Sequence, residues 1–202
     1  MKHFLLAVAL LASSITVAAQ STVESAGKKA KQKSDSALPV DPDTQLVTYS
    51  KVIEIPGTTQ EQLYTRAANW IASTEVYRVA SSKQLQEASD KSQLIVSGET
   101  RARGPMNQIV GTVSHSLTIY CKDGRYKYVL TNLREETNST KPNGIGSGGA
   151  FENEKPACGF MLMFPAAWNT IKRHTDEDVQ ELLARLTTTM AATGASKAPS
   201  DF

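Results

Sequence analysis

Apolar and polar residues alternate along two runs that flank Asp123-Gly124. This dipeptide readily supplies the positive φ angles of a two-residue turn, so residues 108–134 are predicted to form an antiparallel hairpin. With the turn at these two residues, the more apolar face pairs Cys121 with Tyr126, Ile119 with Tyr128, Leu117 with Leu130 and His115 with Asn132. Arg134 is expected on the same face, two residues beyond Asn132.

Shorter runs upstream show a similar alternation. Residues 46–55 and 94–103 are predicted to be strands, and residues 76–79 a third, shorter one. Gly104-Pro105 is predicted to turn the chain into the hairpin.

Two segments repeat apolar residues at helical spacing. The first starts at Thr58 and Glu61, which match a capping box, and extends to about Ser73. Its apolar stripe consists of Leu63, Ala67, Trp70 and Ile71. The second stripe runs through residues 165–190 and consists of Trp168, Ile171, Thr175, Val179, Leu182, Leu183, Leu186 and Met190. Both stripes are too apolar to leave in water, so both helices are predicted to pack on the sheet.

The ends of the chain set the predicted domain limits. Residues 1–19 run from a basic start through an apolar stretch to small residues, which is typical of a secretory signal peptide. Cleavage after Ala19 would make Gln20 the first residue of a periplasmic or secreted protein, and no later segment is apolar enough to span a membrane. The remaining predicted segments are a flexible linker at 20–45, a single α+β domain at 46–192 with a Gly-rich loop at 135–165, and a polar tail at 193–202.

Charge and cysteine content indicate which binding partners and which covalent cross-links to expect. Lys+Arg 22 against Asp+Glu 20 leaves the chain nearly neutral, and it lacks the basic face that a nucleic-acid binder normally shows, so no nucleic-acid partner is expected. Cys121 and Cys158 would enter an oxidising compartment, where they could form one disulfide or remain separate thiols.

Few residues suggest a chemistry. Gly144, Gly146 and Gly149 match G-x-G-x-x-G, but the motif does not connect a strand to a helix and is interpreted as a loop. The acidic residues between Asp176 and Glu181 spread over more than one helix face and are interpreted as solvated, so no metal or other cofactor is expected.

The segments EQLYTRAANW and KDGRYKYVLTNL, which begin at Glu61 and Lys122, resemble an exported bacterial family found mainly in the Bacteroidetes. That family is known as a domain of unknown function with a TATA-binding-protein-like fold. The resemblance covers residues 48–134 and implies an α+β fold, a curved antiparallel sheet with helices packed on one side in the order β-α-β-β-β-β-α, similar in outline to helix-grip folds. It implies no activity, because the family offers no established catalytic or binding residues to carry over.

Two functions fit these predictions. The favoured one is a non-catalytic envelope module that binds a protein partner or a small apolar ligand, enclosed between the C-terminal helix and the sheet. Its candidate ligand-binding residues are His115, Asn132, Arg134 and Tyr128. The alternative is a hydrolase acting on an envelope component, for which His115, Asn132 and Arg134 are the only convergent polar group and no nucleophile is identifiable. The favoured hypothesis has two forms, a protein partner and a small apolar ligand. The observation that separates them is whether the space beneath the final helix is filled or hollow.

Overall fold

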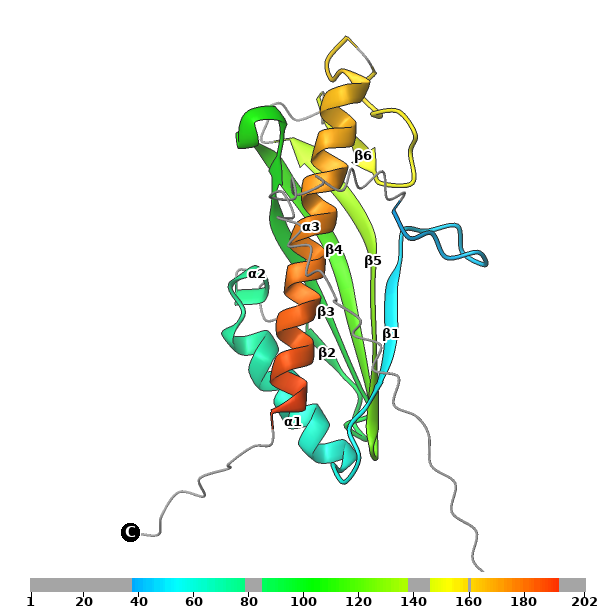
Figure 1. The fold of residues 1–202 in the computed structure, drawn as a ribbon, viewed down its shortest axis with the longest axis vertical. Helices are drawn as coiled ribbons and strands as arrows, with labels where there is room; N and C mark the ends of the chain where they lie inside the picture. Colours follow the sequence, from blue (N-terminus) through cyan, green and yellow to red (C-terminus); the bar gives the residue numbers. More distant parts are fainter. Residues whose placement is uncertain (1–37, 79–84, 138–145, 160, 193–202) are drawn as a thin grey trace, which may run out of the picture. The chain divides into compact units, whose positions relative to one another are not determined.

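An antiparallel sheet with helices on one face makes up the α+β fold of this computed structural model, which describes residues 38–78, 85–137, 146–159 and 161–192 (Figure 1). The strands are β1 (Tyr49–Glu54), β2 (Leu85–Glu87), β3 (Gln93–Arg103), β4 (Ile109–Lys122), β5 (Arg125–Thr137) and β6 (Gly149–Ala150). The helices are α1 (Gln60–Ser73), α2 (Glu75–Arg78), the 3-10 turn η2 (Pro105–Asn107) and α3 (Pro165–Ala191). The strand order is β1-β5-β4-β3-β2, and β6 also pairs with β5. The predicted signal peptide and polar tail lie outside the described residues, as does most of the predicted linker.

The central hairpin forms around Asp123 and Gly124 as predicted, but its register changes part-way along. Three of the four predicted pairs are confirmed: Cys121 with Tyr126, Ile119 with Tyr128 and Leu117 with Leu130. Ser116 then pairs with Thr131 and Ser114 with Arg134, so a bulge adds one residue to β5. Asn132 adopts a φ of 58° at this bulge, a left-handed conformation that asparagine tolerates better than most residues. The predicted pairing of His115 with Asn132 is therefore wrong.

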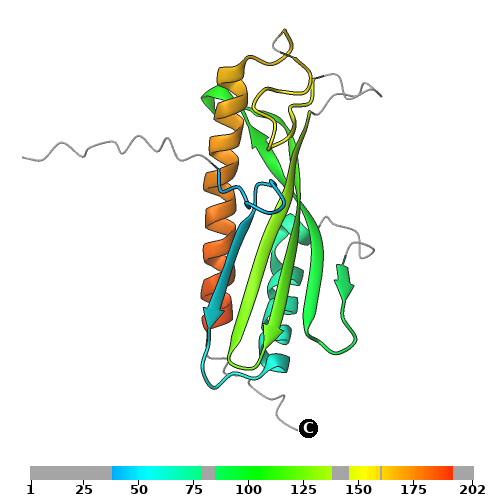
Figure 2. The same ribbon diagram turned by 90° about the vertical axis from the view of Figure 1, so that its right-hand side faces the viewer.

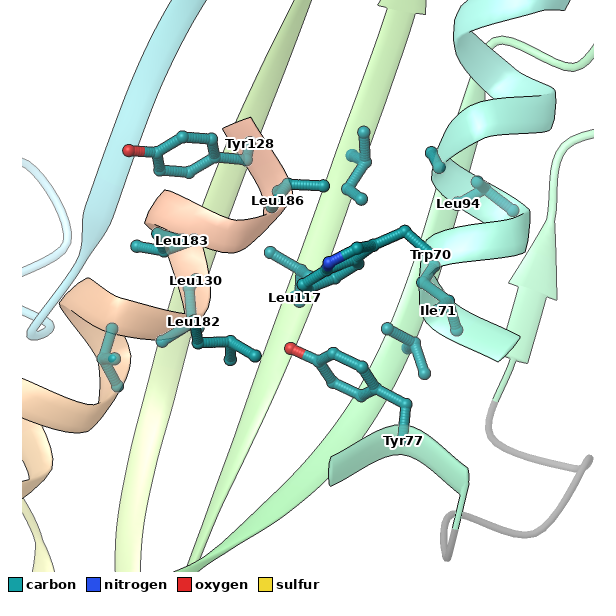
Figure 3. Close-up of a cluster of buried hydrophobic side chains, with 14 of the residues drawn as sticks. Trp70, Ile71, Tyr77, Leu94, Leu117, Tyr128, Leu130, Leu182, Leu183 and Leu186 are labelled. Carbon is teal, nitrogen blue, oxygen red and sulfur yellow. The ribbon is translucent and has the colours of Figure 1, made fainter. Parts of the chain in front are cut away.

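Apolar side chains fill the space between the helices and the sheet. All eight residues of the predicted α3 stripe are buried, and so are the four predicted for α1. Leu182, Leu183 and Leu186 extend from α3 toward Leu117 and Leu130 of the sheet, while Trp70 and Ile71 approach from α1 (Figure 3). Both helices thus cover one face of the sheet, as the view along its edge shows (Figure 2).

Hydrogen bonds connect the start of α1 to the hairpin turn. The predicted capping box is displaced by one residue, because the side chain of Thr59 caps the helix and Gln62 completes the box. Asp123 Oδ1 accepts a hydrogen bond from the Gln60 amide at 2.7 Å, and the Gly124 amide donates to the Thr58 carbonyl at 2.8 Å. The cap is therefore at Thr59, where the helix can also bond to the turn.

Two local elements differ from the prediction. Residues 76–79 were expected to be a strand, yet Glu75–Arg78 form α2, since the Tyr77 ring packs against Trp70 with ring centroids 5.6 Å apart. The short strand of the sheet is instead β2, which lies later in the chain. Tertiary packing of one aromatic ring overrides the local strand pattern here.

The segment predicted as a Gly-rich loop at 135–165 has more structure than expected. Residues 135–137 continue β5, and β6 pairs with β5 at Arg134 and Glu135. Trp168 is fully buried against Phe151, and a Cβ at Gly148 would overlap the Trp168 ring. Gly148 thus has a packing role, because only glycine lets the backbone approach the indole so closely.

The two cysteines are separate thiols. Cys121 pairs with Tyr126 beside the hairpin turn, whereas Cys158 bonds through its amide to Ser147, close to Glu135. Glu135 lies nine positions after Tyr126 along β5, which corresponds to roughly 30 Å of strand. A disulfide needs Cα atoms within about 7 Å, so of the two alternatives that the sequence left open this fold has the separate thiols.

Candidate functional site

A groove of about 640 Å³ lies beside β3, between α2 and α3. Its walls come from these three elements, because β2 as described is much shorter than β3 and pairs only with the first part of that strand. The lining residues are Glu75 and Val76 of α2, Glu99, Thr100, Arg101 and Arg103 of β3, and Asp178, Glu181, Leu182 and Arg185 of α3.

Beyond Val96, the edge of β3 that borders the groove has no strand partner among the residues that the structure describes. In the described part of the chain, β2 pairs with β3 only as far as Val96. The Gln93 carbonyl points toward β2, where it accepts from the Ala88 amide at 3.0 Å. Backbone groups of alternate residues share one side of a strand, so those of Ser97, Glu99 and Arg101 also point to this edge. The groove therefore adjoins a row of hydrogen-bond donors and acceptors at strand spacing.

Charged side chains dominate the groove. Seven of its ten lining residues are ionisable, four acidic and three basic. Arg103 pairs with Asp178 at 2.6 Å, and His174 Nδ1 lies 2.9 Å from the Arg103 carbonyl oxygen, so the end of β3 is fastened to α3. Glu99 and Arg101 take part in no ion pair within the described ranges. Such a lining suits a polar partner and not an apolar molecule.

A buried aromatic pair supports the α2 wall. Tyr77 Oη lies 3.1 Å from His115 Nε2, beneath α2. Gly98 provides the room for this ring, since a Cβ there would lie 2.8 Å from Tyr77 Cδ1. Burial lowers the pKa of His115 to about 4, so the imidazole is neutral at physiological pH. His115 thus supports α2 through Tyr77 and does not face the groove.

The structure does not bring the other predicted ligand-binding residues to His115. Beyond the bulge the alternation of β5 reverses, so that Leu133 and Glu135 are buried while Asn132 and Arg134 are exposed. Arg134 lies 3.7 Å from Glu136 in a surface ion pair. The predicted polar group of His115, Asn132 and Arg134 does not form, because the bulge turns the last two to the opposite face.

Tyr128 belongs to the core. Its ring lies beneath α3 near Leu186, and 9% of the residue is exposed (Figure 3). Burial raises the pKa of its hydroxyl. Tyr128 therefore supports the packing of α3 on the sheet.

The acidic residues of α3 are less solvated than predicted. Asp176 is almost buried and accepts a hydrogen bond from Tyr49 Oη at 2.7 Å, while Asp178 binds Arg103. These carboxylates hold the helix to β1 and β3. Within the described ranges no group of His, Cys, Asp and Glu side chains is arranged to hold a metal ion.

Residues 49–136 match the model of a family described as a domain of unknown function (DUF4468) with TBP-like fold. The chain contains a DUF4468 domain. The matched residues include α2 and β3, whereas α3, which forms the opposite wall of the groove, follows the match. Thus the DUF4468 domain supplies the sheet and the strand edge, and the C-terminal helix completes the site.

Two solved structures are similar to this chain at low sequence identity. A TBP-like protein from Parabacteroides distasonis is 14% identical, with a TM-score of 0.49 over 70% of this chain and 93% of its own. A DUF4468 family protein from Bacteroides ovatus is 17% identical, with a TM-score of 0.47 over 73% of this chain and 89% of its own. No curated protein matches the chain. No helix in the described ranges combines the length and apolar character needed to cross a bilayer.

Proposed function

We propose that this is an exported, non-catalytic binding module that holds an extended segment of another envelope protein along the edge of β3. The observation that carries the proposal is the row of backbone groups at Ser97, Glu99 and Arg101, which border a charged groove. A partner strand added there would continue the sheet, with main-chain hydrogen bonds giving affinity and the groove receiving alternate side chains.

The charges of the groove define the partner segment. Glu99 and Arg101 flank the free edge, and Arg185 and Glu181 stand on the α3 wall. A strand that alternates charged and small polar residues would match this mixture, because opposite charges across paired strands stabilise and like charges destabilise. A purely apolar segment would desolvate Glu99 and Arg101 without giving either charge a partner.

A small apolar ligand beneath α3 has less support. The leucines of α3 and the aromatic residues of α1 and β5 occupy the space in which it would lie (Figure 3). The hydrolase alternative has less support as well, since the polar residues on which it depended lie on opposite faces of the sheet.

Selection of a displayed peptide library on the mature chain tests the proposal. Glu99→Pro removes an outward-pointing amide that an added strand would use, and proline is tolerated on an edge strand. We expect selected peptides to bind Glu99→Pro about tenfold more weakly than the unmodified chain, as loss of a hydrogen bond at a docked strand implies.

Ser50→Pro is the matched control, because Ser50 lies on β1 at the opposite edge of the sheet. Its amide also points outward, since the neighbouring Thr48 amide donates to Pro39 and the Ile55 amide to Gly124. Peptides that bound all three chains equally, or a library that yielded no binder, would contradict the proposal.

Export is tested separately. We expect the protein recovered from the periplasm or medium to begin at Gln20, because the first nineteen residues have the pattern of a cleaved signal. Amino-terminal sequencing that returned Met1 from such material would refute this part of the proposal.

A further inference from the structure

The face of the sheet turned away from the helices holds a second hollow, of about 400 Å³, near the β4–β5 turn. It spans three neighbouring strands of the sheet, β1, β5 and β4. The outward-pointing lining residues are Val52, Tyr120, Lys122, Arg125, Lys127 and Val129.

The strand register places a cation between two apolar side chains. Lys127 of β5 pairs with Val52 of β1 on one side and with Tyr120 of β4 on the other. Val52 is 53% exposed and Tyr120 40% exposed, which is high for large side chains of a sheet. The hollow therefore combines an apolar and aromatic floor with a positive charge at its centre.

Two more cations lie in the adjacent row. Arg125 pairs directly with Lys122, and like charges in such positions destabilise a hairpin. Within the described ranges none of Lys122, Arg125 and Lys127 forms an ion pair. A bound anion would relieve this repulsion. Anion binding therefore explains why three cations lie together at a place where they do not stabilise the fold.

Acidic neighbours limit the positive area. Glu54 stands opposite Arg125 on β1. The carboxylate of Asp41 is also nearby, since its pKa is lowered mainly by hydrogen bonds from Thr44 and slightly by Lys127. A polyanion or an anionic membrane needs a wide basic surface. The hollow therefore suits a single small anion.

We propose that this hollow binds a small anionic amphiphile. Its carboxylate, sulfate or phosphate group lies among Lys122, Arg125 and Lys127, and its apolar or aromatic body lies over Val52 and Tyr120. The volume falls within the range of ordinary ligand pockets, about 300 to 1,000 Å³. This site shares no lining residue with the groove and lies over β1, β5 and β4, so it is independent of the proposed peptide-binding edge.

Two fluorescent probes with similar bodies test the charge requirement on the mature chain. Anilinonaphthalene sulfonate is anionic, and phenylnaphthylamine lacks the sulfonate. We expect the anionic probe to bind about tenfold more tightly, as a charge-assisted contact provides, and Lys127→Glu to abolish this preference while the neutral probe keeps its affinity. Tyr120→Ser is expected to weaken both probes, because it removes the aromatic floor.

Lys51→Glu is the control, since it makes the same charge change at a position that pairs with Tyr128, on the helix-covered side. An equal loss of the anionic probe in both lysine variants would overturn the proposal, because the effect would then come from net charge. Equal binding of the two probes to the unmodified chain would overturn it too. Lys127-dependent sedimentation with phosphatidylglycerol vesicles, without binding of the free probe, would assign the surface to a membrane instead.

Discussion

Gly98→Ala tests how α2 is held on the sheet. The new methyl group would lie 2.8 Å from Tyr77 Cδ1 and 2.9 Å from His115 Nε2, well inside van der Waals contact. The Tyr77 ring must then move, and its hydrogen bond to His115 is lost. Overpacking costs about 1 to 3 kcal/mol, and a buried polar group left without its partner costs a similar amount. Because the two effects share one displacement, we expect the free energy of unfolding to fall by about 2 to 4 kcal/mol.

Urea unfolding followed by tryptophan fluorescence measures this loss, and the same substitution in a Tyr77→Ala chain identifies its cause. Without the Tyr77 ring, the His115 imidazole has room to move away from the added methyl group, so Gly98→Ala should then cost less than about 1 kcal/mol. The coupling between the two positions is expected to be about 2 kcal/mol. An unchanged stability for Gly98→Ala, or the same cost in both backgrounds, would refute the contact on which the α2 wall depends.

Three further predictions concern the core, a buried histidine and the thiols. Leu186→Ala should cost about 2 to 5 kcal/mol in urea unfolding, as for other buried leucines, whereas Glu181→Ala on the exposed side of α3 should stay within about 0.5 kcal/mol; equal effects would mean that α3 is not packed on the sheet. The pKa of His115 falls from 6.5 to about 4 on folding, so the unfolded chain binds the proton more tightly. Stability should therefore decrease by up to about 3 kcal/mol as the pH falls from 6.5 to 4, and a His115→Phe chain that showed the same loss in that window would contradict this. Cys121 and Cys158 should both react with a thiol reagent in unfolded, non-reduced protein, and a count of zero thiols would restore the disulfide.

Much of the fold could be predicted from local pattern. The helical stripes and the turn at Asp123-Gly124 each depend on residues close in sequence, and the structure confirms them. The bulge at Asn132 also had a signal in the sequence, because the apolar residues of β5 change from even positions, as at Leu130, to an odd position at Leu133. Reading that reversal would have separated His115 from Arg134.

The groove was beyond prediction for a different reason. It exists because β2, within the described residues, begins only at Leu85, opposite Val96, while β3 continues to Arg103, and because Tyr77 packs α2 onto the sheet. The position of α2 depends on a contact between residues 38 positions apart in sequence, Tyr77 and His115. The charges at Glu99 and Arg101 are typical of an edge strand, but by themselves they do not reveal which edge stays open.

Amide hydrogen exchange of the mature chain, with and without a selected peptide, tests most directly whether the free edge of β3 binds a polypeptide. The outward amides of Ser97, Glu99 and Arg101 should exchange quickly in the free chain and slow by about a hundredfold at saturation, because an added strand would use them as hydrogen-bond donors. The outward amide of Ser50 on β1 should be unaffected. Slowing at Ser50 and not at Glu99, or no slowing in a chain that binds the peptide, would contradict the assignment of β3 as the binding edge.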